Sequence, residues 1–125
     1  MLPAFGASGA GVLTTLHSFN VLTNGAVPNQ LVRGSDGYFY GTTANGGTNG
    51  SYGTVFKISI DGVLTSLYSF TDGADGANPQ AGLVRGSDSY FYSTTDDGGA
   101  YGGGTVFKIG TNGYADHLAL LHRCK

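Results

Sequence analysis

The chain has 125 residues and a mass of 12.8 kDa, the size of one ordinary domain, and it carries 23 glycines but only 11% charged residues. All eight acidic residues are Asp, so the composition is poor in helix formers and rich in turn formers, which excludes a helical bundle or a coiled coil. The formal net charge is −2, the basic residues are scattered, and no apolar run approaches ~18 residues, so we expect neither a nucleic-acid partner nor a membrane-spanning helix.

The chain repeats itself. The stretch LVRGSD at 31–36 recurs unchanged at 83–88, and GTVFKI at 53–58 recurs at 104–109. Such self-similarity, with a period of about 50 residues, is typical of a repeat architecture. The period divides the chain into four expected segments. These are a remnant of a preceding repeat at 1–10, a first repeat at 11–61, a second repeat at 62–112, and a divergent tail or partial third repeat at 113–125.

Each repeat predicts four short strands, read from apolar and polar alternation between turn residues. The first is expected over 13–19 and, in the second copy, over 64–70. The second is expected near 30–34, the third over 38–43 and the fourth over 54–59, each with a counterpart in the second copy.

A tight turn is expected between the second and third strands, because Asp36-Gly37 supports the positive φ of a two-residue hairpin. In the second copy Ser89 stands where the first copy has Gly37, so that turn is expected to be strained or of another type. A Gly-rich loop, at 45–53 and again at 97–104, leads into the fourth strand.

Several of the expected strands carry apolar residues on both faces, and such strands are usually covered on both sides. A four-stranded antiparallel unit of ~50 residues, repeated and covered on both faces, is typical of a β-propeller blade, whereas β-solenoids use shorter coils. We therefore predict an all-β, propeller-like tandem repeat of four-stranded antiparallel blades, with two full blades and partial ends.

Two blades cannot close a ring, since propellers typically need ~4–8. The chain is therefore expected either to join further repeats or to self-associate, for example as a trimer or a tetramer. Each outer blade would otherwise expose an apolar face, which invites association.

Three stretches carry a family resemblance: LVRGSDGYFYGTTANGG at 31–47, GTVFKISIDGVLTSLYSF at 53–70 and DGADGANPQAGLVRGSD at 72–88. They closely resemble the GloVer tandem repeat of bacterial surface or secreted choice-of-anchor proteins, over about residues 11–110. The resemblance implies a propeller-like β-repeat in a secreted or cell-surface parent protein, and it transfers no catalytic residues. Residues 1–11 have no basic n-region or apolar h-region, so no signal peptide is visible in this chain.

A metal hypothesis concerns Asp72, Asp75 and Asn78, which lie together in a Gly-rich loop. Hard oxygen ligands on such a loop could hold calcium, and no other cofactor is indicated. The alternative is ordinary turn chemistry, in which Asx side chains bond to their own backbone.

Two pairs of polar residues recur at equivalent places. Asp36 and Asp88 could bind a ligand or could cap their own hairpins through side-chain bonds to the backbone. Arg33 and Arg85 are expected to have a structural role, pairing with an Asp of a neighbouring strand or blade.

Tyrosines are the candidate ligand-binding residues. Tyr38 and Tyr90 could stack on sugars, because an aromatic face with a polar hydroxyl suits carbohydrate, or could pack between blades. Tyr52 and Tyr101 lie in the Gly-rich loops, so we expect them to be exposed and to be the better binding candidates.

No nucleophile with a positioned base is visible, so we expect no enzymatic activity. The favoured hypothesis is a non-enzymatic extracellular module that acts as a binding or scaffold unit, with a glycan or a protein as its ligand. The second hypothesis is a structural repeat that self-assembles into rings or fibres. The third is a carbohydrate-active enzyme built on a propeller.

Overall fold

The structure is a computed structural model that describes residues 11–111 and 119–120. The predicted remnant at 1–10 lies outside the described residues, as does the predicted tail at 113–125 apart from one two-residue strand. Within the described residues the protein is all-β and contains no helix, so the predicted fold class is confirmed at that level. No helix in this part of the chain is long and apolar enough to cross a membrane.

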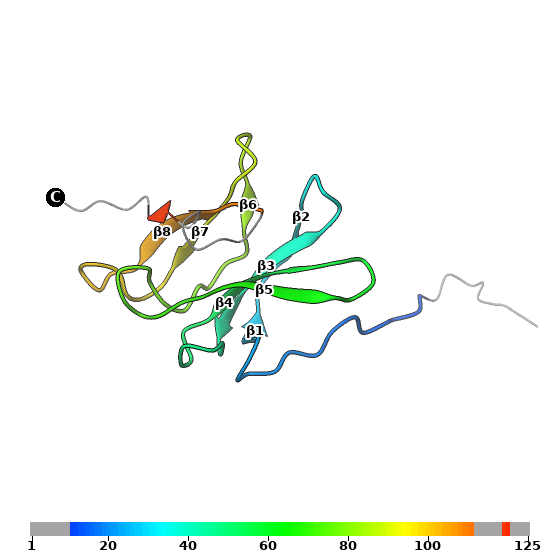
Figure 1. The fold of residues 1–125 in the computed structure, drawn as a ribbon, viewed down its shortest axis with the longest axis horizontal. Helices are drawn as coiled ribbons and strands as arrows, with labels where there is room; N and C mark the ends of the chain where they lie inside the picture. The colour runs from blue at the N-terminus through cyan, green and yellow to red at the C-terminus, as the bar shows by residue number, and fades with distance from the viewer. Residues whose placement is uncertain (1–10, 112–118, 121–125) are drawn as a thin grey trace, which may run out of the picture.

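The strands form two antiparallel sheets, and neither sheet is closed within the described part of the chain (Figure 1). The first sheet has the order β1-β3-β4-β5, with β2 also paired to β3, and the second has the order β6-β7-β8-β9. The strands of the first sheet are β1 (Ala26–Pro28), β2 (Val32–Arg33), β3 (Phe39–Asn45), β4 (Thr54–Ile58) and β5 (Leu64–Ser69). Those of the second sheet are β6 (Val84–Arg85), β7 (Phe91–Thr95), β8 (Thr105–Ile109) and β9 (Ala119–Leu120).

The strand predicted over 13–19 is wrong, because this segment has no strand structure. Its counterpart in the second copy does form a strand, β5, which pairs with β4 of the preceding repeat. The physical reason is that a strand needs a neighbouring strand to pair with. Backbone N–H and C=O groups need a neighbouring strand to form a ladder, and no described strand lies beside 13–19. The first sheet therefore takes its last strand from the repeat that follows.

The pairing register assigns each side chain to one of two faces. In the first sheet Phe39 lies opposite Ile58 on one face, and Tyr40 lies opposite Val32 on the other. We call the first the phenylalanine face and the second the tyrosine face. The phenylalanine face comprises Phe39, Phe56 and Ile58 in the first sheet and Phe91, Phe107 and Ile109 in the second. The tyrosine face comprises Val32, Tyr40 and Val55 in the first sheet and Val84, Tyr92 and Val106 in the second.

The core lies between the two sheets. The tyrosine face of the first sheet packs on the phenylalanine face of the second, and the ring of Tyr40 stacks on Phe91 with centroids 4.3 Å apart. Phe70, just after β5, meets Phe107 edge-on at 5.2 Å. Such aromatic pairs contribute about 0.5–1.5 kcal/mol each beyond their buried area. The buried cluster consists of Tyr40, Val55, Phe70, Leu83, Phe91, Phe107 and Ile109.

Polar bonds fasten the two sheets beside this core. The side-chain amide of Asn78 donates to the carbonyl of Ala44 at 2.9 Å, and its backbone N–H donates to the carbonyl of Tyr52 at 2.7 Å. The Thr42 hydroxyl donates to the carbonyl of Ala81 at 2.8 Å. These bonds run from one sheet or its connecting loop to the other, so they hold the two sheets together beside the apolar core.

Candidate functional site

The two hairpins that join β2 to β3 and β6 to β7 are held by the same side-chain arrangement. The backbone N–H of Tyr38 donates to Asp36 Oδ1 at 3.1 Å, and the hydroxyl of Tyr40 donates to Asp36 Oδ2 at 2.6 Å. Tyr90 and Tyr92 donate to Asp88 in the same way. Both carboxylates therefore cap their own hairpins.

The hairpin hydrogen bonds shift the pKa of Tyr40, Tyr92 and Asp88. Burial, followed by the hydrogen bond to Asp36, holds the pKa of Tyr40 well above its ordinary value. In the second hairpin the hydrogen bond from Tyr92 lowers the pKa of Asp88, and the same bond raises the pKa of Tyr92. The shifts move the tyrosine pKa values further above pH 7 and the Asp88 pKa further below it, so these groups keep one charge state near pH 7 while they hold their hairpins.

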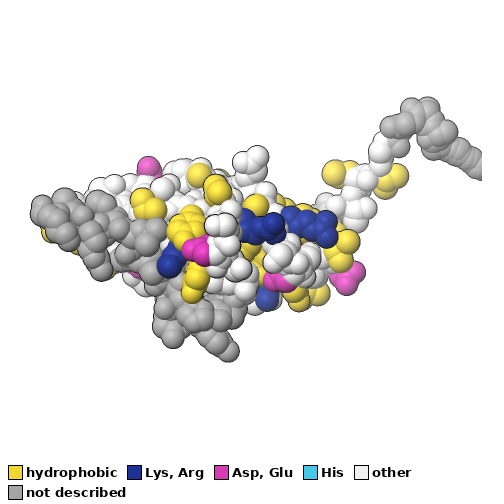
Figure 2. Space-filling view, turned by 90° about the horizontal axis from the view of Figure 1, so that it is seen from above, with side chains coloured by type: hydrophobic (Ala, Val, Ile, Leu, Met, Phe, Trp, Pro, Cys, Tyr) yellow, Lys and Arg dark blue, Asp and Glu magenta, His cyan; other side chains and the backbone are white. Residues whose placement is uncertain are grey.

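Among the residues that the structure describes, neither recurring arginine has the expected Asp partner. Arg85 donates from Nη1 to the backbone carbonyl of Arg33 at 3.2 Å, and the guanidinium of Arg33 lies 5.9 Å from the ring centroid of Phe39. Figure 2 views the end of the molecule with the two hairpins and shows basic side chains next to one another, with acidic and hydrophobic ones nearby. The Arg85 bond links β6 to β2 between the two sheets, whereas the Arg33 guanidinium stays over its own sheet.

Each predicted tyrosine platform already has a cation on its ring. The ammonium of Lys57 lies 4.4 Å from the ring centroid of Tyr38, and that of Lys108 lies at the same distance from Tyr90. Tyr38 also packs against the buried cluster. One side of each ring is therefore occupied within the chain itself.

The two loop tyrosines lie in different surroundings. Tyr101 is exposed, as expected. The expectation for Tyr52 is wrong, because Tyr52 is half-buried and packs against the core cluster. Tyr52 is half-buried because its loop contacts residues that are distant in the sequence. Asn78 donates to the carbonyl of Tyr52, and Pro79 contacts Gly53, where a Cβ would lie 2.8 Å from Pro79 Cδ. The loop is thereby drawn onto the second sheet.

The candidate calcium ligands face different parts of the molecule. The carboxylate of Asp75 accepts hydrogen bonds from the hydroxyls of Tyr68 and Thr71, both at 2.7 Å, and from two backbone N–H groups of its own loop. The Asn78 amide instead points across to the first sheet. Within the described ranges no three His, Cys or Asp side chains gather as a metal-binding group. Calcium binding by Asp72, Asp75 and Asn78 stays a prediction.

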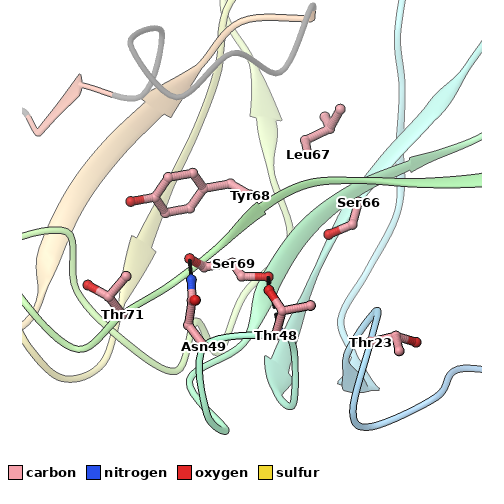
Figure 3. Close-up of a pocket in the computed structure, with 8 residues that line it drawn as sticks. All are labelled: Thr23, Thr48, Asn49, Ser66, Leu67, Tyr68, Ser69 and Thr71. Atoms are coloured by element: carbon pink, nitrogen blue, oxygen red, sulfur yellow. Dashed lines mark hydrogen bonds between the residues drawn. The ribbon is translucent and has the colours of Figure 1, made fainter.

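A polar hollow of about 420 Å³ lies along β5, which ends the hydrogen-bonded path of the first sheet (Figure 3). Its lining comes from β5, from the loop between β3 and β4, and from the turn before β1. The Asn49 side-chain amide donates to the carbonyl of Ser69 at 2.9 Å, and the Thr48 hydroxyl donates to Ser69 Oγ at 3.3 Å. The lining residues are Thr23, Thr48, Asn49, Ser66, Leu67, Tyr68, Ser69 and Thr71.

None of these lining residues is among the sequence-predicted ligand residues. A difference between the two repeats, in the loop before the fourth strand, could have indicated them. This loop carries Thr48 and Asn49 in the first copy and no corresponding Thr-Asn pair in the second. Tyr68 is held at the hollow by its bond to Asp75, and burial together with this bond keeps the pKa of Tyr68 well above its usual range.

Comparison with known protein families identifies the family to which the repeated sequence belongs. The sequence model of the Gloeobacter/Verrucomicrobia repeat matches residues 5–124. The chain belongs to this repeat family. The match covers nearly the whole chain, and it confirms the resemblance of the LVRGSD and GTVFKI motifs as far as the repeat is concerned. No curated protein and no solved structure matches the chain.

Proposed function

We propose that this member of the repeat family is a non-enzymatic extracellular module whose sheets stack as propeller-like blades and whose loop-lined edge binds a glycan. The blade-like stacking is supported by the packing of one tyrosine face on the next phenylalanine face, with equivalent residues at equivalent positions. The secreted or cell-surface location rests on the resemblance of the repeat motifs.

The polar hollow carries the ligand part of the proposal. Most of its lining residues are Thr, Ser or Asn, which offer hydroxyl and amide groups, and Leu67 and Tyr68 add apolar surface. Sugars combine many hydroxyls with apolar ring faces, and such a mixed lining can pair with both. Thr48 and Asn49 are already held by Ser69, so part of the site is arranged before a ligand arrives.

The test is a glycan array followed by calorimetric titration of the glycans that bind. Thr48→Val keeps the side-chain shape and removes one hydroxyl, so we expect affinity to fall about tenfold, the equivalent of one hydrogen bond. Thr65→Val removes an exposed hydroxyl on the same β5 strand outside the lining, and it serves as the matched control. Failure of the wild-type chain to bind any glycan would overturn the proposal.

The same titration separates this hollow from the predicted loop platforms. If Tyr52→Ala or Tyr101→Ala abolishes binding while Thr48→Val has no effect, the ligand lies on the Gly-rich loops and the hollow is the wrong site.

A further inference from the structure

The two tyrosine faces carry matching residues and differ sharply in exposure. In the first sheet Tyr40 and Val55 are 0% exposed, because the second sheet covers them. In the second sheet Val84 is 67% and Val106 is 40% exposed. Among the described residues no further sheet packs on this second tyrosine face, so a surface that is core in one repeat is left open in the next.

The phenylalanine face of the first sheet is also left partly uncovered, whereas that of the second sheet is covered by the first. It carries a hollow of about 240 Å³, where Leu31 is 50% exposed although its counterpart Leu83 is 6% exposed. Each lining residue has a counterpart at the equivalent position of the second repeat. The lining consists of His17, Phe19, Pro28, Asn29, Leu31, Phe56 and Ile58. The counterparts are Tyr68, Phe70, Pro79, Gln80, Leu83, Phe107 and Ile109.

The local packing around the two positions is nearly the same. Phe19 meets Phe56 edge-on at 5.1 Å and 67°, and Phe70 meets Phe107 at 5.2 Å and 66°. Phe70, just after β5, and Phe107 of the second sheet form one buried cluster with Tyr40 of the first sheet. The hollow of the first sheet is thus the same receptor surface without the tyrosine face that fills it in the second.

We propose that this hollow receives the second tyrosine face of another copy of this chain, head to tail, in the geometry of the internal sheet–sheet contact. The inference rests on the proposed blade-like stacking and is independent of the ligand hollow along β5. Tyr92 would stack on Phe39 of the neighbouring copy, as Tyr40 stacks on Phe91 inside the chain. Val84 and Val106 would take the places that Val32 and Val55 occupy inside the chain.

One difference makes the contact between copies weaker than the internal one. Asn78, which joins the internal sheets through three side-chain hydrogen bonds, has Val27 as its counterpart on the receptor surface. Val27 has no amide to donate, so the intermolecular contact loses these bonds. Because the two contacting surfaces differ, the association is heterologous and builds a ring or an open chain of copies.

Sedimentation equilibrium over a range of concentrations tests the inference. The wild-type chain should form species larger than the 12.8 kDa monomer. Val106→Asp blocks the tyrosine face, and Leu31→Asp blocks the receptor hollow. Each should weaken association roughly a hundredfold or more, because a carboxylate would be buried without a partner. Leu22→Asp places the same charge on an exposed apolar residue that lines neither surface, and it should associate like the wild type.

Mixing the two blocked variants is the decisive step. Val106→Asp keeps an intact hollow and Leu31→Asp keeps an intact tyrosine face, so the mixture should form one 1:1 dimer that does not grow further. Dimer formation also shows that both variants are folded, and Val84→Asp provides a second block of the tyrosine face.

Three outcomes would overturn the inference: a wild-type chain that stays monomeric, a single variant that associates as well as the wild type, or a mixture that forms no dimer. Glycan binding by the Val106→Asp variant reports separately on the proposed ligand function. The two proposals can therefore fail independently.

Discussion

Asp36 and Asp88 make the same two hydrogen bonds, yet the turns beside them differ by one residue. Gly37 has φ 88° in the first hairpin, and Ser89 has φ 73° in the second. A left-handed conformation costs an L-residue about 1–2 kcal/mol, whereas glycine adopts it freely. The Asp88 cap therefore holds a turn whose central residue is strained.

Replacing Ser89 with Gly should relieve this strain. Part of the gain is offset by the greater entropy of glycine in the unfolded chain, so we expect Ser89→Gly to raise the unfolding free energy by about 0.5–1 kcal/mol. Differential scanning calorimetry should record a rise in Tm of a few degrees. The reverse change, Gly37→Ser, should lower Tm by a similar amount, and equal Tm values for all three chains would contradict the argument.

The protected hydroxyls of Tyr40 and Tyr68 make stability depend on alkaline pH. Their folded pKa values are raised above the ordinary value of ~10. The contribution of each protonated hydroxyl is fully present below pH ~10, and it is lost as the pH rises from there through the raised folded pKa. The chain should therefore be less stable in urea denaturation as the pH is raised above ~10.

The comparison for this prediction is Tyr40→Phe, which keeps the ring on Phe91 and removes the titrating group. It should show a shallower alkaline loss of stability than the wild type. Absorbance titration supplies the second readout, because in urea all eight tyrosines should titrate near the ordinary value. A folded wild-type chain that titrates in the same range as the urea-unfolded chain would exclude the protection.

At the scale of elements, strand formation follows from the partner as well as from the local pattern. Residues 13–19 and 64–70 have the same alternation, and only the second segment, beside β4, forms a strand. The third and fourth strands were predictable because each pairs with its neighbour in sequence through a short loop. The first strand was predicted in both copies, but it forms only in the second, where its partner β4 belongs to the preceding repeat.

Asn78 is the residue through which one loop joins two sheets. Its amide reaches the carbonyls of Ala44 and Ser51 and the side chain of Asn45, while its own backbone has φ 56°. The sequence favoured a turn or metal role for this residue. It could not indicate a contact with the end of β3 and the loop that follows it, which belong to the preceding repeat.

Removing this amide should loosen the two sheets. We expect Asn78→Gly, which tolerates the positive φ, to lower the unfolding free energy by about 1–3 kcal/mol, because carbonyls facing the loop lose their donors. Gln80→Ala, at an exposed position two residues on, should change it by less than ~0.5 kcal/mol. Chemical denaturation measures both, and an Asn78→Gly chain as stable as the wild type would show that these bonds contribute nothing.

For the whole molecule, the buried cluster draws residues from both sheets, so neither sheet has a complete core of its own. Tyr40 and Val55 come from the first sheet, and Phe91, Phe107 and Ile109 come from the second. The unit of packing is therefore the contact between sheets. The two stacked sheets therefore present two unlike outer surfaces, the phenylalanine face of the first sheet and the tyrosine face of the second.

The sequence by itself determined the fold class, the period, the places of the hairpin turns and the alternation that separates the two faces. Each follows from local chemistry: glycine and Asp at turns, and a side-chain period of two along a strand. The predicted two-residue length of the first hairpin turn is wrong, because Arg33 pairs with Phe39 and residues 34–38 lie between them. Only the tertiary structure decided that β5 pairs with the preceding repeat, that Tyr52 is drawn inward, and that Tyr40 is buried while Tyr92 is not. The local surroundings of Tyr40 and Tyr92 are almost the same in sequence, so their burial depends on whether another sheet lies against them.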